Sequence, residues 1–191
     1  MKKIVVAITG ASGSLYAARL LEHLRRLRSQ IPMEVGVVFS ENAQTVWKWE
    51  TDLPLPQDFP IYAPKDYFAP FASGSARYEA MVIVPCSMGT AGRIAAGVSD
   101  DLITRAADVM LKERRQLILV PRETPLHSGH LRILLKVSQL GAIILPAMPA
   151  FYQRPRTLEE LADTVVGRIL DHLGLPANYP RWGSEPPASP V

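Results

Sequence analysis

The chain has 191 residues with a net charge of +3, 48% hydrophobic and 20% charged residues, and no apolar run long enough to span a bilayer. Its basic residues are scattered among acidic ones, so a nucleic-acid groove is disfavoured, whereas small anionic ligands fit. The single cysteine, Cys86, excludes an intrachain disulfide and a cysteine-based zinc site, and we expect a cytoplasmic protein. We expect one domain over residues 1–183 and a flexible tail over 184–191.

Apolar runs rich in branched residues alternate with segments of helical spacing along the chain. The runs are 3–9, 33–40, 80–86, 117–121 and 142–147, and the first helical segment carries Leu20, Leu21, Leu24 and Leu27. Continuous apolar strands indicate a parallel sheet covered on both faces, so we predict a Rossmann-like, doubly wound α/β fold with ligands at the carboxyl ends of the strands. The proline-rich segment 52–78 is expected to be a long loop with a short edge strand at most.

The sequence TGASGSLY, residues 9–16, connects the first strand to the first helix. Unpaired N–H groups at the start of that helix make residues 10–13 a candidate phosphate cradle. A nicotinamide dinucleotide is disfavoured, because Ser14 and Tyr16 stand where a dinucleotide fingerprint has glycines, although Glu41 after the second strand could still hold a ribose hydroxyl. The plainest alternative is a tight turn in which Ser12 only caps the helix.

A second turn of small residues follows the third long apolar run. Residues 87–90, Ser-Met-Gly-Thr, begin another helix at the same end of the predicted sheet, so the two turns could hold one ligand together. Cys86 lies directly before this turn, but no histidine is close in sequence, and a small buried residue is the more ordinary interpretation. His127 and His130 lack a third metal ligand, so a metal site is disfavoured.

Several polar residues later in the chain have positions that suggest anion binding. Arg105 and Lys112 share one face of a predicted helix, where a solvated face is the ordinary explanation. Arg122 and Glu123 follow a strand at its carboxyl end, where open α/β sheets bind ligands. Tyr152 lies in a proline-rich loop expected at the same edge, and a phenol near cations suits a phosphate.

Three stretches together, TGASGS, residues 85–131 and residues 141–174 with the sequence AFYQRP, resemble the flavin prenyltransferase family of the UbiX type over nearly the whole chain. The resemblance implies a flavin-binding domain that binds FMN. It implies transfer of a dimethylallyl group from dimethylallyl phosphate to N5 and C6 of reduced FMN, without a metal. The prenylated FMN would then serve a UbiD-type decarboxylase. The family also implies a large homo-oligomer such as a dodecamer.

The resemblance assigns residues to each part of the reaction, with the FMN phosphate near Ser12 and the loops around it. Flavin contacts fall on Gly10, Ala11, Ser12, Ser40, Ser87, Met88, Gly89, Thr90 and Arg122. Contacts with the prenyl donor fall on Lys112, Arg122, Tyr152 and Arg168, with Arg105 on the face of Lys112 and the aromatic residues Tyr67 and Trp182 beside the prenyl chain. Tyr67 departs from the tryptophan expected there. By helical spacing alone, Arg168 would be an ordinary surface charge.

The assigned residue types suit the chemistry. Breaking the allylic carbon–oxygen bond releases phosphate, which needs cations, and leaves cationic character on carbon, which aromatic faces stabilise. Glu50, relayed through Ser12, is the candidate base, and Glu123 is the candidate acid toward phosphate.

Two alternative functions stay open. A flavin-dependent cysteine decarboxylase of the phosphopantothenoylcysteine type would need a histidine after the first helix, and His23 lies too deep in that helix; the other alternative is a non-catalytic flavin-binding module.

Overall fold

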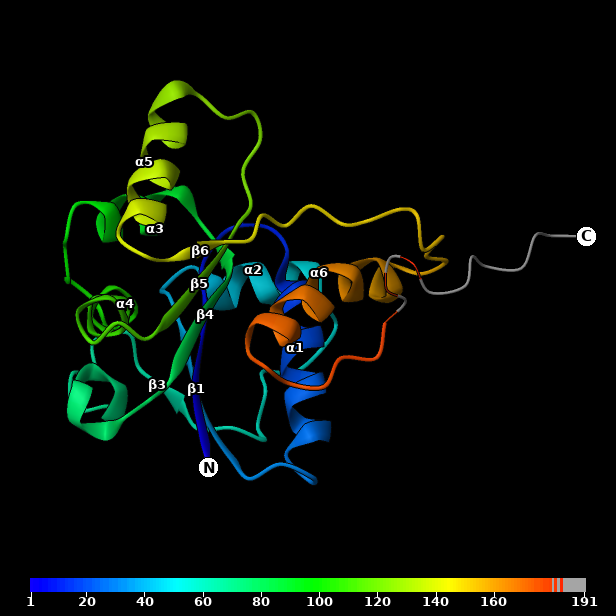
Figure 1. Cartoon of the computed structure of the whole chain (residues 1–191), viewed down its shortest axis with the longest axis horizontal. Helices are drawn as coiled ribbons and strands as arrows, with labels where there is room; N and C mark the ends of the chain where they lie inside the picture. The colour runs from blue at the N-terminus through cyan, green and yellow to red at the C-terminus, as the bar shows by residue number, and fades with distance from the viewer. Residues whose placement is uncertain (180, 182, 184–191) are drawn as a thin grey trace, which may run out of the picture.

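A six-stranded parallel sheet with helices on both faces organises the chain in the computed structural model, which describes residues 1–179, 181 and 183 (Figure 1). The strands are β1 (Lys2–Ile8), β2 (Met33–Phe39), β3 (Ile61–Tyr62), β4 (Ala80–Cys86), β5 (Gln116–Pro121) and β6 (Ile143–Ile144). The α-helices are α1 (Ser14–Leu27), α2 (Ala43–Glu50), α3 (Met88–Ala95), α4 (Leu102–Lys112), α5 (Ser128–Gln139) and α6 (Leu158–His172). Two short 3-10 helices are η1 (Pro70–Ala72) and η2 (Gly74–Ala76).

The strand order is β3-β2-β1-β4-β5-β6, and every pairing is parallel. The chain builds outward from β1 to β2 and β3, then returns to place β4 on the other side of β1. The predicted doubly wound fold is therefore confirmed. The carboxyl ends of β1 and β4 are the topological switch point, where such sheets bind ligands.

The strands are apolar throughout because each face of the sheet is covered. On β1, Ile4, Val6 and Ile8 belong to a hydrophobic cluster shared with α1, α2 and α6. The alternate residues Val5 and Ala7 belong to a second cluster shared with α3 and α4. This two-sided burial is what the continuous apolar runs indicated.

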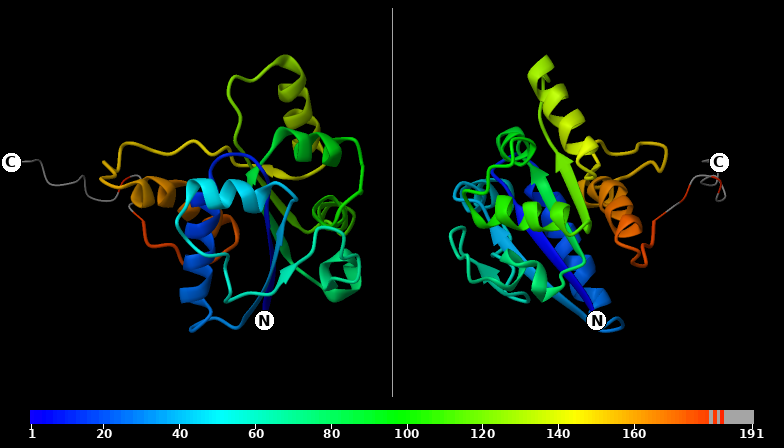
Figure 2. Two further views of the ribbon diagram at one scale, coloured as in Figure 1. Left: turned by 180° about the vertical axis from the view of Figure 1, so that it is seen from behind. Right: turned by 60° about the vertical axis from the view of Figure 1, so that its left-hand side comes forward.

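The segments after β5 are the least regular part of the fold. The last apolar run was expected to be a strand over 142–147, but β6 has only two regular residues. Pairing continues as single hydrogen bonds from the Leu145 N–H to Leu119 O and from the Ala147 N–H to Pro121 O, on either side of Pro146, which has no N–H to donate. Helix α5 stands clear of the sheet (Figure 2), and of its residues only Val137 is buried.

The proline-rich segment 52–78 is a long loop with the short edge strand β3, as predicted. Among the described residues, no helix has the length and apolar character to cross a membrane. Trp182 and the expected tail, 184–191, lie outside the described residues.

Candidate functional site

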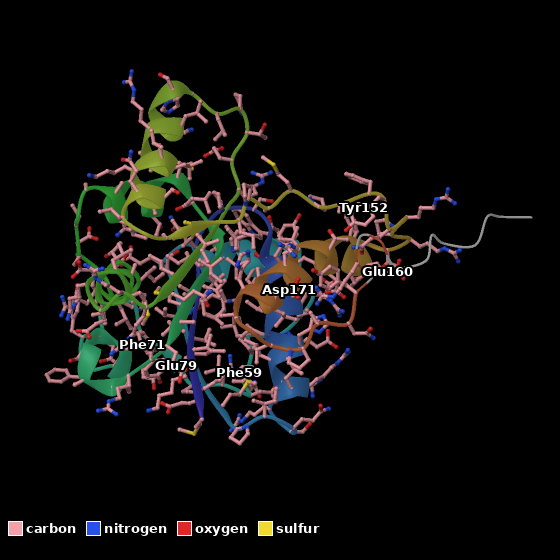
Figure 3. The ribbon with its side chains drawn as sticks, viewed as in Figure 1. Phe59, Phe71, Glu79, Tyr152, Glu160 and Asp171 are labelled. Atoms are coloured by element: carbon pink, nitrogen blue, oxygen red, sulfur yellow. The ribbon has the colours of Figure 1, made fainter. Side chains whose placement is uncertain are left out.

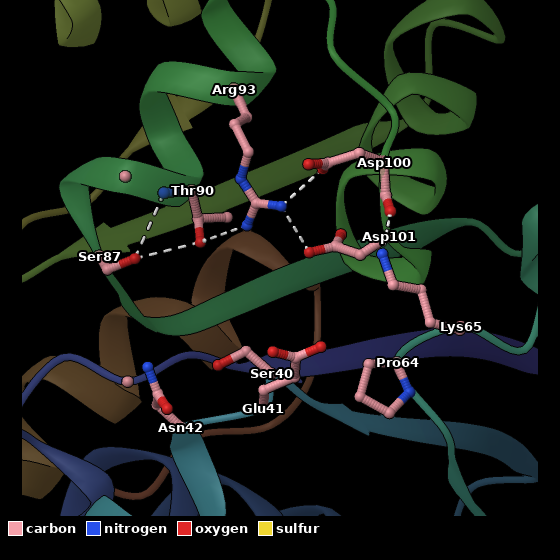
Figure 4. A pocket seen from close by; sticks show the side chains of 12 residues that line it. Ser40, Glu41, Asn42, Pro64, Lys65, Ser87, Thr90, Arg93, Asp100 and Asp101 are labelled. Atoms are coloured by element: carbon pink, nitrogen blue, oxygen red, sulfur yellow. Dashed lines mark hydrogen bonds and ion pairs between the residues drawn. The ribbon is translucent and has the colours of Figure 1, made fainter.

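A pocket of about 560 Å³ opens at the switch point between β1 and β4 (Figure 4). Its walls come from the ends of β1, β2 and β4, the start of α3, the segment after β3 and the residues before α4. The lining residues are Gly10, Ser40, Glu41, Asn42, Pro64, Lys65, Ser87, Gly89, Thr90, Arg93, Asp100 and Asp101. Five residues predicted to bind the cofactor are thus brought together: Gly10, Ser40, Ser87, Gly89 and Thr90.

The start of α3 forms the most complete anion cradle of this pocket. Ser87 caps the helix: its Oγ accepts from the Thr90 N–H at 3.3 Å and donates to Thr90 Oγ1 at 3.1 Å. The N–H groups of Met88 and Gly89 have no hydrogen-bond partner within the described residues. A Cβ added at Gly89 would meet no heavy atom within 4 Å, so the helix end faces open space. The side chain of Met88 is buried, and only its backbone faces the cradle.

The start of α1 differs from the expectation that it holds a phosphate. The N–H groups of Gly13 and Ser14 donate to Glu50 Oε2 at 2.8 and 2.7 Å, so a carboxylate from the end of α2 already occupies this helix end. Burial acts to raise the pKa of Glu50, but hydrogen bonds from the Ser12 side chain and these N–H groups outweigh it and lower the pKa below its usual value. Gly13 has φ +120°, a conformation that favours glycine. The helix end in this region that stays open to a ligand is therefore that of α3, and a phosphate near Ser12 stays a prediction.

The structure also adds charged residues to the pocket that the sequence analysis did not assign. Arg93 Nη1 lies 2.6 Å from both Asp100 Oδ1 and Asp101 Oδ2. Lys65 Nζ donates to the backbone O of Asp100 at 2.6 Å. Burial acts to raise the pKa of Asp101, but hydrogen bonds from Thr104 and Arg93 lower it, so Asp101 is ionised at neutral pH. An aspartate before a helix is a capping signal in a sequence, but the pairing of Asp100 and Asp101 with Arg93 depends on the turn between α3 and α4.

Arg122 and Glu123 follow β5, next to the pocket strand β4, as predicted. The Arg122 N–H donates to Cys86 O at 3.2 Å, which ties the end of β5 to that of β4. Burial raises the pKa of Tyr16 on α1, and the positive charge of Arg122 opposes that rise. Glu123 is exposed, and its carboxylate accepts the Thr124 N–H at 3.0 Å.

Arg105 and Lys112 do not reach this pocket within one chain. Arg105 Nε donates to Ala72 O at 3.0 Å, and its Nη1 pairs with Asp108 Oδ2 at 3.2 Å. Lys112 ends α4, near the amino end of β5, and pairs with Glu113 at 2.7 Å. Because α4 begins at the pocket and runs away from it, a contact between these cations and the donor stays a prediction.

Tyr152 and Arg168 lie on the α6 side of the molecule. Tyr152 is half-exposed in the loop between β6 and α6 (Figure 3), and the Ala150 N–H donates to Thr164 Oγ1 at 3.0 Å, which fixes this loop to α6. Arg168 is exposed one turn after Thr164 and pairs with Asp171 at 3.0 Å. Tyr67, on the β3 side, is also half-exposed.

The competing chemistries find little support in the geometry. Cys86 is fully buried, and burial raises the pKa of its thiol to about 12, which opposes a thiolate nucleophile. The rings of His127 and His130 stack at 3.6 Å, and the described residues contain no group of three potential metal ligands. His23 Nε2 lies 3.2 Å from Asp163 Oδ1 between α1 and α6, away from the pocket.

Comparison with known proteins identifies the family of the chain. Residues 1–170 match the family model Flavoprotein. The chain is 46% identical to the flavin prenyltransferase UbiX of Methanocaldococcus jannaschii over 95% of this chain and 99% of the relative, and 46% identical to that of Pseudomonas aeruginosa over 96% and 95%.

Solved structures give the same result. AnUbiX (PadA1) in complex with FMN and dimethylallyl pyrophosphate superposes with a TM-score of 0.90 at 44% identity, covering 96% of this chain and 98% of that one. A dodecameric FMN-dependent UbiX-like decarboxylase from Escherichia coli has a TM-score of 0.88 at 41% identity over 96% and 100%. A PPC decarboxylase mutant complexed with pantothenoylaminoethenethiol is only 22% identical and shares the fold alone. The chain therefore belongs to the Flavoprotein family and, within it, to the flavin prenyltransferases of the UbiX type.

Proposed function

We propose that this chain is a flavin prenyltransferase that binds FMN in the switch-point pocket and transfers a dimethylallyl group from dimethylallyl phosphate to N5 and C6 of the reduced flavin. The observation that carries the proposal is the open anion cradle of Ser87, Gly89 and Thr90 at the start of α3, in a chain 44% identical to a structure that contains FMN and a prenyl donor.

The residues present suit an FMN phosphate. The α3 end offers two unpaired N–H groups, those of Met88 and Gly89, and the hydroxyls of Ser87 and Thr90, in a position where the helix dipole favours an anion. Ser40 contributes another hydroxyl from the end of β2. The pocket volume of about 560 Å³ lies within the ordinary range for a small-molecule site.

Reduced FMN supplies the carbon–nitrogen and carbon–carbon bond-forming chemistry when it is bound. Around it, Arg122 would bind the leaving phosphate of the donor, and Glu123 would protonate it. Arg168 and Tyr152 would hold the same phosphate from the α6 side. Glu50 is a carboxylate beside Ser12 at neutral pH, so it can accept a proton that leaves the flavin, with the Ser12 hydroxyl as relay.

The wider context of the reaction follows from the same proposal. The dodecameric assembly of the Escherichia coli structure supports a homo-oligomer. Lys112 and Arg105, which lie away from the pocket of their own chain, would then contact a donor bound to a neighbouring copy. The product, prenylated FMN, would pass to a UbiD-type decarboxylase.

The mass of the flavin extracted after reaction tests the proposal. The protein is incubated without oxygen with reduced FMN and dimethylallyl phosphate, and in parallel with the diphosphate donor. A mass gain of one prenyl group is expected with at least one donor. An unshifted flavin with both donors, in protein that has bound FMN, would contradict the proposal.

A further inference from the structure

Arg93 is a pocket residue to which neither the motifs nor the proposed reaction assigns a role. It lies one turn after Thr90 on α3, and its guanidinium extends into the pocket opposite Ser40 (Figure 4). Its Nη1 is held by Asp100 and Asp101, each at 2.6 Å, while Nη2 makes only a long hydrogen bond of 3.4 Å to Thr90 Oγ1. Its Nε–H has no partner within the described residues. Donor capacity is therefore left on Nε and Nη2 of a side chain that lines the pocket.

One of the two carboxylates that hold Arg93, that of Asp101, is itself fixed. Asp101 is the N-cap of α4: its Oδ1 accepts the Thr104 N–H at 2.8 Å, and Thr104 Oγ1 returns a hydrogen bond to the Asp101 N–H at 3.2 Å. Because this capping box anchors Asp101, the guanidinium is oriented before any ligand arrives. A preoriented side chain loses little conformational entropy when it binds.

Thr90 connects Arg93 to the anion cradle. Its Oγ1 receives a hydrogen bond from Ser87 Oγ at 3.1 Å on one side and from Arg93 on the other. The N–H of Gly89 lies at the same end of α3, which faces open space. A phosphate held by the first turn of α3 therefore lies within reach of the guanidinium, which can bind it through two donors.

The balance of charge in the pocket lining depends on Arg93. Its charged lining residues are the cations Lys65 and Arg93 and the carboxylates Glu41, Asp100 and Asp101. Without Arg93, three carboxylates would face one cation, a field that repels a phosphate dianion but acts weakly on an uncharged flavin.

We propose that Arg93 makes the pocket selective for the phosphorylated flavin, FMN, over riboflavin, by binding the terminal phosphate and neutralising Asp100 and Asp101. The inference rests on the proposed function, because it takes FMN as the occupant of this pocket.

Dissociation constants for FMN and riboflavin, measured from the quenching of flavin fluorescence, test the inference. Arg93→Ala should weaken FMN binding roughly ten- to 150-fold, the effect of losing a hydrogen bond to a charged group, and leave riboflavin binding nearly unchanged. Arg93→Lys should retain part of the selectivity, because it keeps the charge. Asp100→Asn removes an exposed carboxylate outside the capping box, so it should tighten FMN binding and leave riboflavin binding unchanged.

The matched control is Arg19→Ala, which also removes an arginine paired with two carboxylates, Glu22 and Asp163, but away from the pocket. It should leave both dissociation constants unchanged. Equal weakening of FMN and riboflavin by Arg93→Ala would mean that Arg93 only supports the loop, and unchanged FMN binding would mean that it does not contact the phosphate; either result overturns the inference. A parent protein that binds and prenylates FMN preserves the proposed function in both cases, whereas a parent that binds neither flavin overturns both.

Discussion

Glu50→Gln separates two roles of one carboxylate, the hydrogen bonding to the start of α1 that the structure shows and the role of base that we propose. Glu50 reaches from the last residue of α2 to the start of α1, where its Oε2 accepts the N–H groups of Gly13 and Ser14. Glutamine keeps the shape and an acceptor oxygen but removes the charge and the basicity. If Glu50 is the base of prenyl transfer, single-turnover formation of the prenylated flavin should slow by ~10²–10⁴-fold while FMN binding is retained.

The same substitution should also destabilise the protein by a modest amount. A hydrogen bond to a charged acceptor contributes ~1.5–3 kcal/mol and one to a neutral acceptor ~0.5–1.5 kcal/mol, and solvent exposure of Glu50 reduces the difference. We therefore expect a loss of about 1 kcal/mol in the free energy of unfolding. Because the pKa of Glu50 is lowered in the folded state, this contribution is present above the unfolded pKa of about 4.3 and is lost as the pH falls through the folded value.

Anaerobic single-turnover kinetics, FMN titration and urea unfolding at pH 7 and at acid pH measure the two roles independently. Glu79→Gln, at an exposed site away from the pocket (Figure 3), is the control and should leave all three unchanged. A Glu50→Gln variant that prenylates FMN at the rate of the parent would remove Glu50 from the mechanism. If such a variant were also less stable, Glu50 would be only a cap for α1.

Three further predictions concern α6. Arg168→Ala should raise the dissociation constant for dimethylallyl phosphate roughly ten- to 150-fold and leave that for FMN unchanged in parallel titrations; donor binding equal to that of the parent would leave Arg168 as a surface charge. Gly167→Ala should lower the free energy of unfolding, measured in urea, by ~1–3 kcal/mol, because the added Cβ would overlap the ring of Tyr179. The control Gly92→Ala, on α3, should raise the free energy of unfolding by ~0.5–1 kcal/mol, because its Cβ would make an ordinary contact at 3.5 Å. Equal effects of the two substitutions would refute the packing argument. Asp163→Asn should lower the free energy of unfolding by up to about 2 kcal/mol at pH 7, because burial acts to raise the pKa of this carboxyl but hydrogen bonds and charges from its partners on α1 lower it to about 2. This contribution is present above pH ~3.9 and is lost as the pH falls toward 2. The stability of the variant in urea should therefore depend less on acid than that of the parent, and an unchanged acid dependence would contradict the assignment.

The sequence was sufficient to predict those parts of the molecule whose structure depends on residues close together in the chain. Two-sided burial makes parallel strands continuously apolar, so the runs along the chain located the long strands. The turn at 87–90 could be predicted as a cradle because it follows its strand directly. The length of β6 could not be predicted, since it depends on how the segment around Pro146 meets the edge of β5.

The parts of the site that sequence reasoning missed depend on contacts between distant segments. The family resemblance put Glu50 near Ser12, but nothing near residues 13 and 14 indicates that their N–H groups donate to Glu50, which lies 36 residues after Ser14. Likewise, Arg93 at helical spacing reads as an ordinary solvated charge, and only the turn before α4 brings Asp100 and Asp101 to it. In both cases the charged group was visible in the sequence, but its partner was set by the packing of the loops.

The distribution of cations separates the binding of the cofactor from the binding of the donor. Arg93 and Lys65 border the switch-point pocket, in which we propose that FMN binds, whereas Lys112 lies at the far end of α4, whose eleven residues at ~1.5 Å each place it roughly 15 Å along the helix from the pocket wall. That separation exceeds the reach of one hydrogen bond of about 3 Å, and Lys112 does not line the pocket of its own chain. If Lys112 binds the donor, as the family resemblance implies, it acts at the pocket of another copy. The complete site then requires the oligomer.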